Sequence, residues 1–242
     1  ARRPNAATRA PLAARCREEV NTPPVKVTVL FFNDLHGHLL PFQVKGEDGQ
    51  KREVGGIARL GGLVKKIRAV NDAQGSKTVV LAAGDFLQGT PMSTVFHGKP
   101  DVEAMNLIGV DAMTIGNHEF DFGLENFLAL KSLARFPIIS SNIFKRDGDP
   151  LADGHIAVNL GPGLDLIVIG ATTPELLVTT KPENVADLDC LMFATPGEYL
   201  DGHPAVHNIA IGQDLADGSF DGHSSWAEKW SRPRCSSWMW LD

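Results

Sequence analysis

Cysteine is scarce in this chain of 242 residues, which contains only Cys16, Cys190 and Cys235. Three widely spaced cysteines exclude a disulfide framework and a zinc site built from cysteines. Long apolar runs are absent as well, because no window approaches the roughly 18 to 20 apolar residues that span a bilayer. The sequence therefore predicts a globular chain without a membrane span.

Positive charge is in deficit, with 23 Lys and Arg residues against 29 Asp and Glu residues and a formal net charge of −6. This balance argues against nucleic acid or an anionic membrane as the main partner. Arginines concentrate only at the start, so residues 1–24 are interpreted as an Arg-rich flexible tail. This tail lacks the apolar core of a secretory signal. Because the chain opens with Ala1 rather than Met, the cellular location of the protein must be inferred from other features.

Strand and helix patterns alternate between residues 25 and 180. The β-branched and aromatic run 25–32 predicts a buried strand, and apolar residues from 57 to 70 repeat at helical spacing. Similar patterns predict strands at 78–83, 112–115, 137–140 and 164–169, and helices at 101–108 and 124–133. Alternating strands and helices favour a layered α/β fold, in which ligands bind in loops beyond the carboxyl ends of the strands.

Two such loops carry potential metal ligands. Asp34 and His36 follow the first predicted strand, and alternate residues of an extended segment point the same way, so both side chains can converge on one ion. Asp85 follows a buried run, where a carboxylate is costly unless it is paired or coordinated. The structural alternatives are a capping aspartate beside a surface histidine in the first loop, and a turn or helix N-cap in the second.

A third loop contains Gly116-Asn117-His118-Glu119-Phe120-Asp121. The amide oxygen of Asn117 can coordinate a metal, and Asp121 can hold the imidazole of His118 in one tautomer. Because the three loops follow successive strands, they predict one shared site. In such sites a bridging carboxylate holds two metal ions about 3.5 to 4 Å apart for phosphate chemistry.

The three loops together resemble the first signature blocks of the 5'-nucleotidases, a family within the calcineurin-like metallophosphoesterases. The blocks are residues 33–37 (Asn-Asp-Leu-His-Gly), 84–89 (Gly-Asp-Phe-Leu-Gln-Gly) and 116–121. The resemblance extends over about residues 25 to 174, with similar stretches at 55–59 and 140–142. It implies a four-layer αββα sandwich, with helices flanking two β-sheets, and a catalytic domain at residues 25–180.

The resemblance also implies a role for each site residue. Asp34 and His36 would bind a first divalent ion, Asp85 would bridge both ions, and Asn117 would bind the second. His118 would stabilise the transition state or protonate the leaving oxygen, with Asp121 orienting it. A metal-activated water would then hydrolyse phosphate esters, with nucleoside 5'-monophosphates or related nucleotides as the expected substrates.

The donor set fits zinc, manganese, cobalt or iron without choosing among them. The family resemblance suggests an extracellular or periplasmic location, and the sequence predicts no oligomeric state. The chain has no Gly-x-Ser-x-Gly nucleophile elbow and no Gly-x-x-x-x-Gly-Lys-Ser/Thr phosphate loop, which argues against two other hydrolytic mechanisms.

Residues 181–242 depart from the family pattern. The family takes further metal ligands from later histidines, for which the candidates here are His203, His207 and His223. No strand or helix period is evident, and all four tryptophans fall in the last 17 residues. One hypothesis is a shifted reading frame, an unusual splice form or a truncated gene, which would truncate the fold. The alternative function is then a catalytically inactive fragment, or a metal-binding module that retains the fold.

Overall fold

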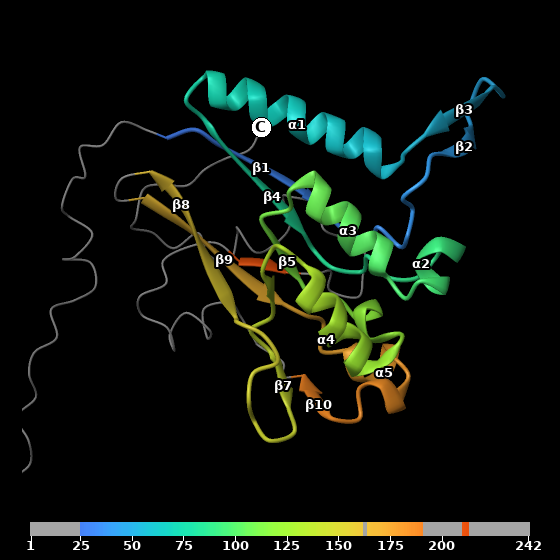
Figure 1. Cartoon of the computed structure of the whole chain (residues 1–242), viewed down its shortest axis with the longest axis vertical. Coiled ribbons are helices and arrows are strands. Elements are labelled where there is room, and N and C mark those ends of the chain that lie inside the picture. Colours follow the sequence, from blue (N-terminus) through green and yellow to red (C-terminus); the bar gives the residue numbers. More distant parts are fainter. Residues whose placement is uncertain (1–24, 162–163, 191–209, 213–242) are drawn as a thin grey trace, which may run out of the picture. The chain divides into compact units, whose positions relative to one another are not determined.

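The computed structural model describes residues 25–161, 164–190 and 210–212 (Figure 1). The first sheet has four parallel strands in the order β1 (Val27–Phe32), β4 (Lys77–Ala82), β5 (Ala112–Thr114) and β6 (Ile138–Ile139). The second sheet has the order β11 (Ala210–Gly212), β9 (Leu164–Ala171) and β8 (His155–Gly161). In it, β9 pairs parallel with β11 and antiparallel with β8.

Helices cover one face of the first sheet, and the second sheet packs on the other (Figure 1). The covering helices are α1 (Ile57–Ala73), α3 (Lys99–Ile108) and α4 (Gly123–Leu133). Residues 79–82 of β4 are all apolar because both faces of the strand are buried: Val80 and Ala82 pack in the helix-side core, and Val79 and Leu81 pack toward the second sheet. The α/β prediction is therefore confirmed, and the described residues supply three of the four expected layers.

Several short elements carried no periodic signal. They are the hairpin of β2 (Phe42–Lys45) and β3 (Lys51–Val54), the strands β7 (Ile143–Lys145) and β10 (Leu188–Cys190), the helices α2 (Pro91–Val95) and α5 (Leu176–Thr179), and the 3-10 turns η2 (His118–Phe120) and η3 (Pro182–Asn184). Because β10 pairs with β7 and β11 pairs with β9, the fold continues past residue 180. Strands of three residues are too short to show an alternating pattern.

Some predictions fall outside the described residues. The Arg-rich tail at 1–24, the tryptophan-rich ending and the candidate ligands His203, His207 and His223 all lie there.

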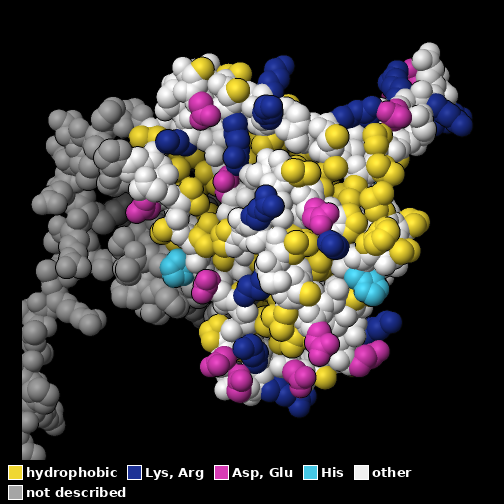
Figure 2. Space-filling model, viewed as in Figure 1, with side chains coloured by type: hydrophobic (Ala, Val, Ile, Leu, Met, Phe, Trp, Pro, Cys, Tyr) yellow, Lys and Arg dark blue, Asp and Glu magenta, His cyan; other side chains and the backbone are white. Residues whose placement is uncertain are grey.

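Within the described part of the chain, no helix has the length and apolar character needed to cross a membrane. Figure 2 shows Lys and Arg side chains interspersed with Asp and Glu on the face viewed, and hydrophobic side chains gathered around α2, where Val95 and Phe96 are exposed.

Candidate metal centre

The loops that follow β1 and β4 lie side by side because the two strands are parallel neighbours. The pairing continues beyond the strands, where the amide of Asp34 donates to the carbonyl of Gly84 (3.2 Å) and the amide of His36 donates to the carbonyl of Asp85 (3.1 Å). These main-chain hydrogen bonds bring potential ligands from residues 34–36 and from residue 85 to one point at the carboxyl edge of the sheet.

The backbone at these ligands is unusual. Asp34, His36 and Asp85 have positive φ angles of 51°, 42° and 54°, a region that residues other than glycine seldom adopt. The extended backbone expected at residues 34–36 is therefore wrong, and turns paired with the β4 loop orient the side chains of Asp34 and His36 instead. Gly89 is required nearby, because its φ is 98° and a Cβ there would lie 2.4 Å from the carbonyl oxygen of His36.

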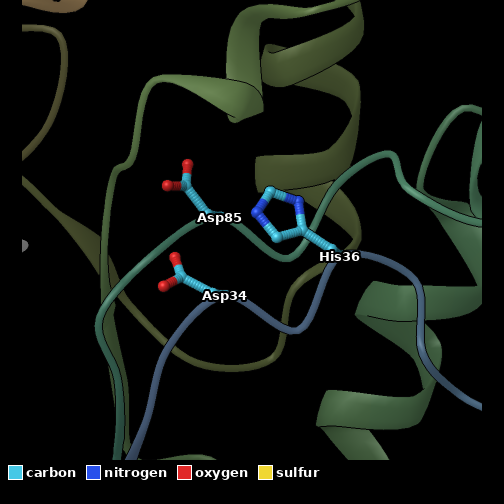
Figure 3. A group of neighbouring side chains, drawn as sticks. All are labelled: Asp34, His36 and Asp85. Carbon is cyan, nitrogen blue, oxygen red and sulfur yellow. The ribbon is translucent and has the colours of Figure 1, made fainter. Parts of the chain in front are cut away.

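Figure 3 shows Asp34, His36 and Asp85 with their side chains gathered around a common point. Their potential ligand atoms all lie within 4.8 Å of one another. Asp34 is exposed, His36 is half-buried and Asp85 is only 6% exposed. His36 Nδ1 lies 3.2 Å from the carbonyl oxygen of Leu87, and in the tautomer that donates this hydrogen bond Nε2 keeps its lone pair for a ligand.

The charge balance of this group suits a cation. Burial raises the pKa of Asp85, the amide of His118 opposes the rise, and the negative charge of Asp34 adds to it. A carboxylate that burial and a neighbouring negative charge destabilise becomes more stable when a positive ion binds beside it. Two carboxylates and an imidazole nitrogen form a donor set that zinc, manganese and iron accept, so these residues fit a divalent metal ion.

Next to this group lies the turn η2, which contains the predicted catalytic pair. His118 Nδ1 is 2.7 Å from Asp121 Oδ2, and this hydrogen bond raises the pKa of His118 while burial opposes the rise. The amide of His118 donates to Asp85 Oδ1 (3.0 Å), and the imidazole rings of His36 and His118 meet edge to face with centroids 4.8 Å apart. The structure thus brings His118 and Asp121 beside the three potential ligands Asp34, His36 and Asp85.

Asn117 is half-buried directly before η2. The amide of the next residue, His118, donates to Asp85. The carbonyl oxygen of Asn117 accepts a hydrogen bond from Thr180 Oγ1 (3.1 Å). The backbone of Asn117 is therefore held close to Asp85, which is where a second ion bridged by Asp85 would need a further ligand.

Sequence reasoning gave no role to Glu119, although it lies inside the third motif. Its side chain is completely buried and accepts hydrogen bonds from the amides of Asp85 (3.0 Å), Phe86 (3.0 Å) and Gly116 (2.5 Å). Burial and the charge of Asp85 raise the pKa of Glu119 to about 8, while the three amides oppose the rise. Two of these partners lie more than 30 residues earlier in the sequence, so no local pattern indicates this role.

Comparisons with known proteins agree with this geometry. The calcineurin-like phosphoesterase family matches residues 27–204. UshA from Escherichia coli is 35% identical over 164 residues, which are 68% of this chain and 28% of that protein. The chain therefore spans less than a third of the length of this relative.

Solved structures give the same result. A 5'-nucleotidase precursor from Thermus thermophilus superposes with a TM-score of 0.64 at 29% identity, over 77% of this chain and 36% of that chain. The sulfate thiohydrolase SoxB from Thermus thermophilus superposes with a TM-score of 0.67 at 26% identity, over 79% of this chain and 44% of that chain. Because the family match covers most of the sequence, this chain belongs to the calcineurin-like phosphoesterase family.

Proposed function

We propose that the chain hydrolyses phosphate monoesters, with nucleoside 5'-monophosphates as the substrate class, in a reaction that depends on divalent metal ions. The observation that carries this proposal is the convergence of Asp34, His36 and Asp85 directly beside the His118–Asp121 pair. Relatives named 5'-nucleotidase, such as that of Vibrio cholerae at 36% identity over 165 residues, favour nucleotides as the substrate class.

Asp34, His36 and Asp85 would hold a first ion, and Asp85 and Asn117 would hold a second. Bound divalent ions supply Lewis-acid stabilisation of phosphoryl oxygens and lower the pKa of water enough for attack on phosphorus near neutral pH. The identity of the ions, among zinc, manganese, cobalt and iron, is left open by the donor set.

The chain's own contribution to proton transfer would come from His118. With Nδ1 donating to Asp121, its other ring nitrogen, Nε2, is the atom that can carry a proton to the departing ester oxygen. The water oxygen would form the new bond to phosphorus, the bond from phosphorus to the ester oxygen would break, and that oxygen would leave as the alcohol. The same imidazolium would also balance charge that builds up on the phosphoryl group.

A second candidate function is a metal-binding module without turnover. Among the described residues, one group of three carboxylate and imidazole side chains could hold an ion, and this observation favours a module that binds a single metal. The extracellular or periplasmic location that the resemblance implies stays a prediction.

The test compares two neighbouring histidines. Phosphate release from AMP would be measured for the wild type, His36→Ala and His38→Ala, with manganese or zinc added after chelator treatment. His38 is exposed and lies outside the group of three, so it is a matched control. We expect metal-dependent release by the wild type and His38→Ala, and a loss of at least about a hundredfold in His36→Ala. If the wild type releases no phosphate with either manganese or zinc, the metal-binding module without turnover is favoured.

A further inference from the structure

Glu119 links two separate loops at the edge of the first sheet. Its Oε2 accepts the amides of Asp85 and Gly116, and its Oε1 accepts the amide of Phe86. Asp85 and Phe86 follow β4, whereas Gly116 follows β5. One carboxylate therefore serves three main-chain donors from two loops, in a position that is closed to solvent.

These amides need an acceptor because they lie beyond the ends of the strands and are buried with Glu119. A buried amide without a partner is strongly unfavourable, and so is a buried carboxylate without donors. A carboxyl group has two oxygens that together accept several hydrogen bonds, whereas an amide side chain has only one acceptor oxygen. Glutamine has the same shape, but one of its two terminal atoms is an NH2 group that donates, so it cannot accept all three amides.

The link is reciprocal. The side chain of Glu119, next to His118, accepts the amide of Asp85, while the side chain of Asp85 accepts the amide of His118 at 3.0 Å. Each loop thus presents a carboxylate to the main chain of the other. The backbone of Asp85 has a φ of 54°, which is unfavourable for an aspartate and persists only where surrounding contacts enforce it.

We propose that Glu119 is a positioning residue that joins the loops after β4 and β5 and fixes the backbone of Asp85 in the conformation that metal binding requires. The inference rests on the proposed function, because it assigns Asp85 to the metal centre. It adds that the affinity for the ions depends on a side chain that touches neither the ions nor the substrate.

The test compares Glu119→Gln with Glu125→Gln. Glu125 lies exposed on α4, so the control makes the same substitution a few residues away, outside the link. The full chain, treated with chelator, would be titrated with Mn²⁺ in a calorimeter, and its fold and melting temperature followed by circular dichroism. We expect Glu119→Gln to bind Mn²⁺ at least about tenfold more weakly, and Glu125→Gln to match the wild type.

The readouts separate positioning from a merely structural role. If Glu119→Gln melts at a lower temperature but binds Mn²⁺ like the wild type, the proposal is overturned. If the wild type binds Mn²⁺ but releases no phosphate from AMP, the proposed function fails while the titration still tests Glu119. A wild type that binds no Mn²⁺ overturns both.

If Glu119→Gln does not fold, a second measurement on the wild type tests the same link. In the wild type, the amide protons of Asp85, Phe86 and Gly116 would be followed individually by hydrogen exchange in NMR spectra. We expect all three to exchange slowly, since each is bonded to the buried carboxylate. Exchange of any of them at the rate of an unprotected amide would contradict the proposed link.

Discussion

In the loops after β1 and β4, the potential ligands Asp34, His36 and Asp85 all have left-handed backbone, whereas Asn117 and Asp121 around η2 have ordinary right-handed helical backbone. The first half of the site is thus made of conformations that cost free energy, and the second half is not. Metal ligands must meet at one point from separate turns, while a hydrogen-bonded pair three residues apart fits within a single helical turn.

The two halves are also held in place differently. Main-chain hydrogen bonds between the β1 and β4 loops hold the first half. Side chains from a later segment hold the second, since Thr180 donates to the carbonyl oxygen of Asn117 (3.1 Å) and Asn184 donates to that of Asp121 (2.8 Å). We therefore expect substitution of Asp34, His36 or Asp85 to disrupt the first half. The second half should tolerate substitutions that leave the backbone of η2 unchanged.

The largest effect is expected where the halves meet, at Asp85. Its carboxylate belongs to the group of three and accepts the amide of His118, so Asp85→Asn weakens both halves. We expect kcat/KM for AMP to fall at least about a thousandfold, which corresponds to about 4 kcal/mol of transition-state stabilisation. Asp72→Asn, an exposed change on α1, is the control. A fall of less than about tenfold would show that Asp85 does not join the halves.

His118→Asn should separate catalysis from metal binding. Loss of the imidazole removes the proposed proton carrier but leaves the amide that bonds Asp85, so kcat should fall by about a hundredfold to ten-thousandfold. Mn²⁺ affinity, measured by calorimetry, should stay close to that of the wild type. If metal affinity fell as far as it does in Asp85→Asn, His118 would belong with the metal-binding half.

Asp121→Asn should have a smaller effect, because we propose that Asp121 acts through His118, to which it is hydrogen-bonded. We expect kcat to fall by about tenfold to a hundredfold, and Asp187→Asn, an exposed change, to leave it unaltered. The double variant His118→Asn and Asp121→Asn should be no slower than His118→Asn alone. Additive losses in steady-state kinetics would mean that Asp121 has a separate role.

The smallest effect on activity is expected at Asp101, a buried residue of α3 that belongs to neither half of the site. Its carboxylate is fully buried without a hydrogen-bond partner of normal geometry among the described residues, and burial raises its pKa from 3.8 to about 6, with Ser93 opposing. Folding then favours the protonated form, so stability is greatest below about pH 4, falls as pH rises toward 6, and stays at the lower level above that.

Asp101→Asn should therefore raise the free energy of unfolding at pH 7, by up to about 3 kcal/mol, and flatten its dependence on pH between 4 and 6. Activity should remain that of the wild type. Urea denaturation at pH 4.5 and pH 7 measures both expectations. A loss of stability at pH 7 would show that the charged form of Asp101 has a stabilising partner.

The sequence was sufficient for those parts of the fold whose signal is local. The apolar run of β4 and the helical spacing of α1 predicted a layered α/β fold, and the polar residues after β1, β4 and β5 predicted where the site lies. The proposed ligands follow parallel strands, whose carboxyl ends meet at one edge. That inference needs only the order of elements along the chain.

Other features depend on contacts between distant residues, which no local pattern records. The left-handed backbone of Asp34 and His36 follows from pairing with residues 84 and 85, and the role of Glu119 follows from bonds to a loop more than 30 residues away. The three-residue strand β10 is defined by its partner β7 rather than by any alternation of its own.

The central claim is that the two halves form one metal centre for phosphate chemistry. Its most direct test is the metal content of protein purified without chelator, measured by elemental mass spectrometry together with phosphate release from AMP. The account predicts about two divalent ions per chain with metal-dependent release, and loss of both in Asp85→Asn. One weakly held ion or none, without release after manganese or zinc is added, would contradict it.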